Sequence, residues 1–150
     1  MKRLLISLPP AFLLLGCGGA EAPQITIENA VMTAPAVRGG PGAAYFTLKT
    51  NMDASRLVSV TSPSIGSIEL HETREEAGRT SMAPLDETGA TFSRGTPLVF
   101  APGGKHAMLI GVAPGLVPGR KVRLTFNVDG AGPVTVEAEV RGPGQAHAAH

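Results

Sequence analysis

The chain has 150 residues, of which 13 are Lys or Arg and 12 are Asp or Glu, so its formal net charge at pH 7 is +1. A near-neutral chain with 4% aromatic residues lacks the basic stripe and the stacking side chains of nucleic-acid-binding proteins, and we expect no nucleic-acid partner. The single cysteine excludes an intramolecular disulfide.

The amino-terminal residues have the pattern of an export signal. Met1-Lys2-Arg3 is a short basic stretch, and the apolar stretch Leu4 to Leu15 is too short for a membrane-spanning helix, which needs about 20 residues. Leu14-Leu15-Gly16-Cys17 resembles the lipobox of bacterial lipoproteins. We therefore predict a signal peptide over residues 1–16, lipidation of Cys17, and a flexible tether over 17–24. A plain secretory signal with an incidental cysteine is the alternative, which the position of Cys17 directly after the apolar run disfavours.

Residues 25–141 show the pattern of a single β domain. Apolar and polar side chains alternate in the last two candidate strands, with the period of two that half-buried antiparallel strands show. Turn sequences rich in Gly and Pro separate the segments, and none sustains a helical repeat. In chain order, the candidate strands are Gln24–Val31, Ala44–Lys49, Arg56–Thr61, Ser67–Thr73, Arg79–Ala83, Pro97–Ala101, His106–Val112, Lys121–Val128 and Val134–Arg141. Short strands spaced in this way predict a sandwich or a barrel.

Two histidines and two methionines form a candidate metal site within this pattern. His106 and Met108 are two residues apart on one candidate strand, so their side chains should leave the same face. His71 lies near the end of another strand, and Met82 follows on the next. Thioether sulfur is soft and imidazole is borderline, a combination that suits Cu(I) better than Mg²⁺, Ca²⁺ or Mn²⁺. We predict a Cu(I) site formed by His71, Met82, His106 and Met108.

Taken singly, each of these residues has a simpler interpretation. A lone methionine on a strand is usually core filler, and a lone histidine near a strand end is usually a surface residue. Their concurrence favours the metal site. Met32 and Met52 have no such partners, and we expect them in the core or in a loop.

The His/Met pattern resembles the copper-binding motif of the PCu(A)C-type periplasmic copper chaperones. The stretches Ile68-Glu69-Leu70-His71-Glu72-Thr73 and Ala101-Pro102-Gly103-Gly104-Lys105-His106-Ala107-Met108-Leu109 carry the likeness, which extends from about Ile25 to Val140. Glu72 stands where some members have a methionine, and the frequent early Trp of the family is missing.

The resemblance implies an all-β fold, a cupredoxin-like antiparallel β-sandwich. It also implies a chaperone that delivers copper for assembly of the CuA centre of cytochrome c oxidase. The partner would be subunit II of the oxidase or a Sco-type thiol protein. With the export signal, this places the chain outside the cytoplasm, in the periplasm, anchored to a bacterial membrane by lipid.

Other functional classes fit the residues less well. A blue-copper electron carrier needs a Cys beside two His, and the only Cys is the predicted lipidation site. No Gly-x-Ser-x-Gly or His-Glu-x-x-His motif occurs, so we do not expect an enzyme. The alternatives that remain are a copper-sequestering or tolerance lipoprotein without a dedicated acceptor, and a metal-free structural β-sandwich lipoprotein.

The carboxyl-terminal residues 142–150 have no large apolar side chain with which to pack, and we expect a flexible tail. His147 and His150 are candidate secondary ligands for Cu(II). The alternative is a frayed end with two histidines of no special role, which the entropic cost of ordering a flexible tail favours.

Overall fold

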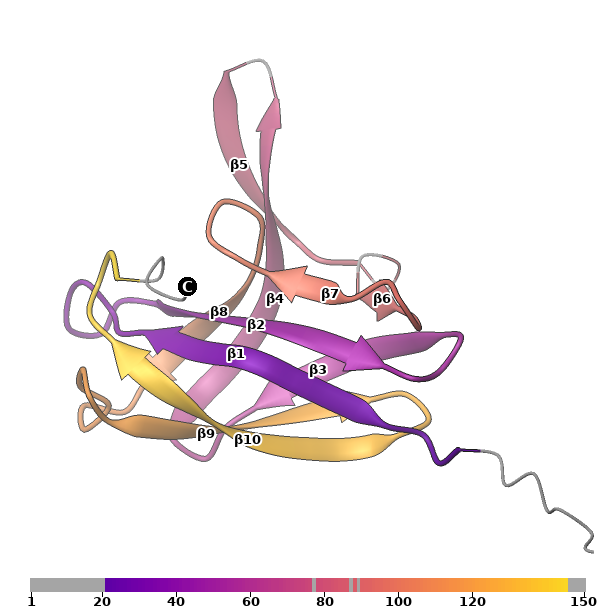
Figure 1. Ribbon diagram of the computed structural model, residues 1–150. Coiled ribbons are helices and arrows are strands. Elements are labelled where there is room, and N and C mark those ends of the chain that lie inside the picture. The colour runs from indigo at the N-terminus through magenta and orange to yellow at the C-terminus, as the bar shows by residue number, and fades with distance from the viewer. Residues whose placement is uncertain (1–20, 77, 87, 89, 146–150) are drawn as a thin grey trace, which may run out of the picture.

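The computed structural model describes residues 21–76, 78–86, 88 and 90–145, and these residues form strands and turns without a helix. Ten strands follow one another along the chain (Figure 1). They are β1 (Ile25–Thr33), β2 (Gly42–Thr50), β3 (Ser55–Thr61), β4 (Ile65–Glu76), β5 (Arg79–Pro84), β6 (Thr91–Phe92), β7 (Leu98–Phe100), β8 (Lys105–Val112), β9 (Lys121–Val128) and β10 (Gly132–Arg141). The all-β prediction is confirmed, and each predicted strand has a counterpart. Only the two-residue β6 was not predicted. No helix in the described part of the chain has the length and apolar character to cross a membrane.

The strands join edge to edge in the order β5-β4-β8-β2-β1-β10-β9-β3-β6, and β7 also pairs with β2. The sheet bends over on itself, so that β9 and β10 lie beneath β1 and β2 (Figure 1). All the pairs are antiparallel except β1 with β10, where Met32 lies opposite Val140 in a parallel register. The predicted cupredoxin-like β-sandwich is therefore confirmed, with one parallel pair in an otherwise antiparallel sheet.

The core lies between the two layers and is built by alternation along each strand. Phe46 on β2 stacks on Phe100 at a ring-centroid distance of 4.4 Å and meets the edge of Phe126 on β9 at 4.7 Å. Met32 is fully buried, as expected of a core methionine, whereas Met52 lies in the bend between β2 and β3. On β8, Ala107 and Leu109 point into this core. His106 precedes Ala107, and Met108 lies between Ala107 and Leu109. Because side chains alternate along a strand, His106 and Met108 therefore point to the outer face.

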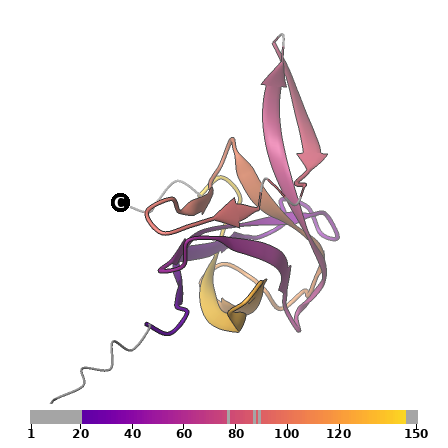
Figure 2. The ribbon, with the colours of Figure 1, turned by 90° about the vertical axis from the view of Figure 1, so that its right-hand side faces the viewer.

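The hairpin of β4 and β5 extends beyond the body of the sandwich. The pairing of β4 with β8 ends at Glu72 and Lys105, while the pairing with β5 continues toward the turn at Gly78. The outer part of this hairpin consequently has no third strand, and both views show it standing clear of the other strands (Figures 1 and 2). The hairpin places Met82 beside the outer face of β4 and β8.

Candidate metal centre

The register between β4 and β8 brings the two predicted histidine ligands together. His71 lies directly opposite His106, and the ring centroids are 5.9 Å apart with an interplanar angle of 50°. A metal about 2 Å from an imidazole nitrogen lies about 3 Å from the ring centre, so two rings on one ion have centres about 5 to 6 Å apart. The observed separation therefore fits a single ion between the two rings.

The two methionines lie on the same outer face as the histidines. Met82 on β5 is opposite Thr73, two residues beyond His71, and Met108 on β8 is opposite Glu69, two residues before it. Directly opposed residues share a face, and so do residues two apart on one strand. All four predicted ligands therefore project from one face of three adjacent strands.

A pocket of about 370 Å³ opens on this face, and three of the four predicted ligands line it: Met82, His106 and Met108. His71 does not line the pocket. It lies across the strand pair, with 12% of its side chain exposed, while His106 is 9% exposed and Met82 is 64% exposed. The site thus combines two shielded imidazoles with one thioether that is open to solvent.

Hydrogen bonds assign a different free nitrogen to each histidine. His106 Nδ1 lies 3.1 Å from the carbonyl oxygen of Gly104 and donates to it, which leaves Nε2 with the lone pair. His71 Nε2 lies 3.1 Å from Glu69 Oε2, which makes Nε2 the donor. His71 Nδ1 is then a buried acceptor, and it has no hydrogen-bond partner among the described residues. A buried nitrogen that lacks a partner is costly, and a metal ion would satisfy it.

The turn between β7 and β8 fixes the ring of His106. Gly103 has φ of 81°, a left-handed conformation that glycine adopts without a steric penalty. The carbonyl of the next residue, Gly104, accepts the backbone N–H of Thr73 at 3.1 Å as well as the His106 ring. One carbonyl therefore ties this turn to β4 and orients the imidazole.

Glu69 orients the other imidazole, and replacing it should weaken metal binding without unfolding the sandwich. Glu69→Gln removes the charge that holds the His71 Nε2 proton, and losing such an outer partner typically costs about 10 to 100-fold in metal affinity. We expect a drop in this range for Cu(I), measured by competition with a chromophoric chelator. Glu75→Gln, on the exposed outer hairpin, is the control. Equal affinities of the two variants would contradict the role of Glu69.

Tyr45 is a pocket residue that the sequence analysis missed. It lies on β2 two residues from Ala43, which is opposite Met108, and both line the pocket. Burial raises the pKa of the Tyr45 phenol, so the group stays neutral and offers no phenolate. The only feature of the sequence that could have indicated this role is the position of Tyr45 in the alternating pattern of β2.

Glu72 lies on the opposite face of β4 from His71 and stays out of the site. It accepts hydrogen bonds at 3.0 Å from both Lys105 and Arg74. The Lys105 hydrogen bond, reinforced by Arg74, lowers the pKa of the Glu72 carboxyl. Glu72, which stands where some PCu(A)C proteins have a methionine, therefore forms an ion pair with Lys105 across β4 and β8 and is not a ligand.

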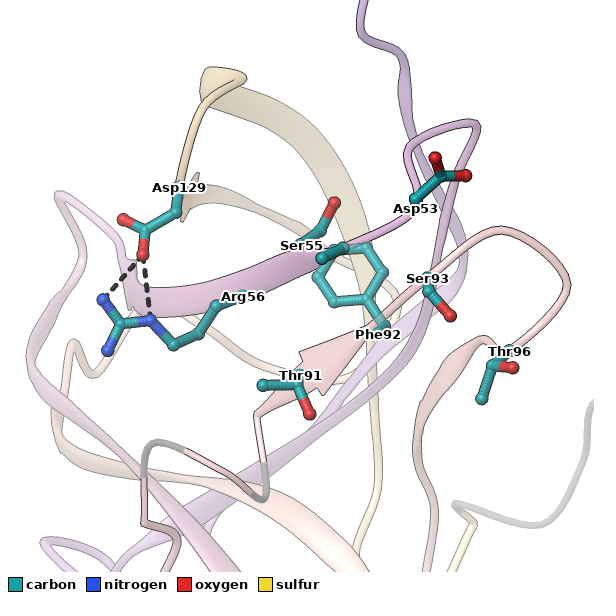
Figure 3. Close-up of a pocket in the computed structure, with 9 residues that line it drawn as sticks. Asp53, Ser55, Arg56, Thr91, Phe92, Ser93, Thr96 and Asp129 are labelled. Carbon is teal, nitrogen blue, oxygen red and sulfur yellow. Dashed lines mark hydrogen bonds and ion pairs between the residues drawn. The ribbon is translucent and has the colours of Figure 1, made fainter.

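A separate hollow beside the start of β3 contains no soft donor. A pocket of about 480 Å³ is lined by hydroxyl groups, Phe92 and two aspartates, and in it Arg56 donates from Nε and Nη2 to Asp129 Oδ2 at 2.9 and 2.6 Å (Figure 3). Asp53 lies on a different loop and points away from this pair (Figure 3). Among the described residues, no group of three or more His, Cys, Asp or Glu is placed to hold a metal ion.

Three further predicted residues, Cys17, His147 and His150, lie outside the described residues. The described part of the tail nevertheless reaches the site, because Pro143 and Gly144 line the pocket with His106 and Met108.

Comparison with known proteins decides the family. Residues 25–140 match the family model described as "Putative lipoprotein LpqE-like". The chain belongs to this family. A relative, "Putative lipoprotein Lxx21020" of Leifsonia xyli subsp. xyli, is 31% identical over 121 residues, which cover 79% of this chain and 71% of the relative.

Solved structures confirm that the fold is that of PCuAC domains. The copper-bound PCuAC domain from PmoF2 superposes with a TM-score of 0.61 at 24% identity, covering 79% of this chain and 93% of that domain. The solution structure of the Cu(I) form of DR1885 from Deinococcus radiodurans gives a TM-score of 0.52 at 25% identity, covering 80% of this chain and 76% of that one. The predicted resemblance to the PCu(A)C family is thus confirmed in the fold.

Proposed function

We propose that this protein is an extracytoplasmic copper chaperone in which His71, Met82, His106 and Met108 hold one Cu(I) ion. The observation that carries the proposal is the shared outer face of β4, β5 and β8, on which His71 faces His106 and a methionine lies to either side. Copper-bound and Cu(I)-bound structures of the same fold support it. The orphaned Nδ1 of His71 is a further support, because copper would satisfy it.

Neutral ligands suit a protein that must release its cargo. Thioethers and imidazoles do not form disulfides in an oxidising compartment, whereas a dithiolate site would tend to close. They also hold Cu(I) less tightly than thiolates do, so the ion can pass downhill to a cysteine-containing acceptor. Met82 is the most exposed of the four ligands. An incoming thiolate would bind the copper from that side as the Met82 sulfur leaves.

The acceptor we propose is a copper-accepting thiol protein of cytochrome c oxidase assembly, either subunit II with its CuA site or a Sco-type protein. A copper-sequestering lipoprotein would share the site but not the transfer step, and a metal-free sandwich would have neither. Copper titration distinguishes the metal-free protein from the other two. Transfer to a purified thiolate acceptor distinguishes delivery from sequestration.

The test of the site is the stoichiometry and spectrum of the reduced, copper-loaded protein. We expect one Cu(I) per chain, little Zn²⁺ in competition, and both sulfur and nitrogen in the first shell by X-ray absorption. A first shell of nitrogen and oxygen alone would overturn the proposal.

Lipidation of Cys17 is the proposed means of anchoring, and membership of a lipoprotein family supports it. Two acyl chains give stable attachment, whereas one gives marginal attachment. Cys17→Ser should move the protein from the membrane fraction to the soluble fraction or block its processing. Immunoblots of the fractions and the mass of the mature protein measure this. An unchanged distribution together with a lipid-free mature mass would contradict it.

A secondary Cu(II) site at His147 and His150 is also proposed. Support comes from the tail entering beside the pocket at Pro143 and Gly144. A chain that ends at Gln145 tests this: it should keep its Cu(I) affinity and bind one equivalent of Cu(II) fewer than the full chain, measured by titration followed by electron paramagnetic resonance. Unchanged Cu(II) binding would remove the tail from the proposal.

A further inference from the structure

An apolar groove of about 380 Å³ lies beside the copper pocket. It runs between the loop after β1 and the loop after β8, and Val37 and Val117 stand on it with 69% and 51% of their surfaces exposed. Ala34 and Pro143 line both the groove and the copper pocket. A molecule seated in the groove would therefore also border the copper site.

Four of the six exposed large apolar side chains among the described residues, all but Val58 and Val99, belong to the groove, the copper pocket or the strand β8 that borders the pocket. Besides Val37 and Val117, Met82 lines the copper pocket, and Ile110 follows Met108 by two residues on β8, between the pocket and the loop after β8. Isolated exposed apolar residues are ordinary, but several of them gathered next to a functional site indicate a contact surface. The patch also borders the thioether at which we expect the exchange of ligands to begin.

Few charged side chains line this surface. Arg38 is the only charged residue that lines the groove, and no charged residue lines the copper pocket, among the residues that the structure describes. A complementary face would be apolar and would carry a carboxylate to pair with Arg38.

We propose that the groove docks the copper-accepting protein, through an apolar face of that protein that carries an acidic side chain opposite Arg38. This inference rests on the proposed chaperone function. Docking there would hold the acceptor thiolate next to Met82 while the ion changes ligands. Docking would raise the effective concentration of the acceptor thiolate at the copper site, because its attack on copper becomes a step within one complex.

Other occupants fit this surface less well. The five residues after Gln145 are Ala-His-Ala-Ala-His, which have no large apolar side chain to fill the groove. A second copy of the chain packed symmetrically would present the same patch to itself, with an arginine and no carboxylate. A membrane surface is recognised by clusters of basic residues, whereas the groove has one.

The experiment uses synthetic peptides with the same pair of cysteines and different flanks. One is flanked by Leu and Glu, a second by Leu and Lys, and a third by Ser and Glu. We expect copper-loaded protein to transfer Cu(I) to the Leu/Glu peptide roughly tenfold faster than to either of the others, the ratio that corresponds to about 1.4 kcal/mol. The Val37→Ser/Val117→Ser double variant should lose this advantage. Val99→Ser, with a comparable exposure of 49% on β7, should keep it.

Reversal of the charge provides the sharper control. Arg38→Glu should slow transfer to the Leu/Glu peptide and accelerate transfer to the Leu/Lys peptide, with Cu(I) affinity unchanged in every variant. Binding of the fluorescently labelled peptides to copper-free protein, measured by anisotropy, tests the groove even if the protein binds no copper. Equal binding of the three peptides would overturn the inference. Three other results would also overturn it, if the Val37→Ser/Val117→Ser variant abolishes them. They are dimers that form as the protein concentration rises, binding of the protein to anionic vesicles, and peptide binding that increases when the five tail residues are removed.

Discussion

His106→Ala should lower the Cu(I) affinity by more than about 100-fold, since losing a direct ligand exceeds the 10 to 100-fold cost of losing an outer partner. The imidazole is buried and already oriented by the Gly104 carbonyl, so no water or neighbouring side chain can readily replace Nε2. Competition against a chromophoric Cu(I) chelator under reducing conditions measures the loss. Circular dichroism of the copper-free variant shows whether the sheet is intact.

Met108→Ala separates the oxidation states in the same experiment. Loss of a thioether should weaken Cu(I) strongly and Cu(II) much less, because soft sulfur contributes mainly to the softer ion. His106→Ala should weaken both. Met52→Ala is the matched control, since Met52 lies in the bend between β2 and β3 and lines none of the three hollows described above. A Met108 variant that behaves like the Met52 variant would leave the site without its sulfur ligand and would contradict the assignment.

The strands could be predicted because their signal is local. Alternation with a period of two, bounded by Gly and Pro, located β9 and β10 almost to the residue, and it placed His106 and Met108 on one face before any pairing was known. The projection of the β4–β5 hairpin was not predictable in this way. It depends on where β8 begins opposite β4, at Lys105 across from Glu72, which no local pattern in residues 72–84 records.

The meeting of His71 with His106 depends on register, which periodicity does not determine. A shift of one residue between β4 and β8 would send the two rings to opposite faces. The resemblance to the PCu(A)C motif supplied that information instead. Glu69 and Tyr45 were both missed. Glu69 contacts His71 two residues along the same strand, and Tyr45 borders the pocket beside Ala43, whose position opposite Met108 depends on the pairing of β2 with β8. The parallel pairing of β1 with β10 likewise has no local signature.

The core beneath the metal face should be the most sensitive part of the fold. Phe46→Ala should reduce the free energy of unfolding by about 3 to 5 kcal/mol, the usual cost of emptying a buried phenylalanine site. Phe46 is fully buried between Phe100 and Phe126, and it connects the two layers of the sandwich. A domain of ordinary stability, about 5 to 15 kcal/mol, would lose a large part of its margin. Urea unfolding followed by circular dichroism measures the change.

Copper gives this measurement an internal check. An ion that binds only the folded chain raises the free energy of unfolding by an amount set by the ion's concentration and affinity. If the outer face is undisturbed, copper should raise it by the same amount in Phe46→Ala as in the parent protein. Val99→Ala removes an exposed side chain and should change the unfolding free energy by less than about 0.5 kcal/mol. A Phe46→Ala loss as small as that of Val99→Ala would mean that the two layers do not share the core described here. An equal increment from copper would show that the metal face depends on strand register and not on the packing beneath it.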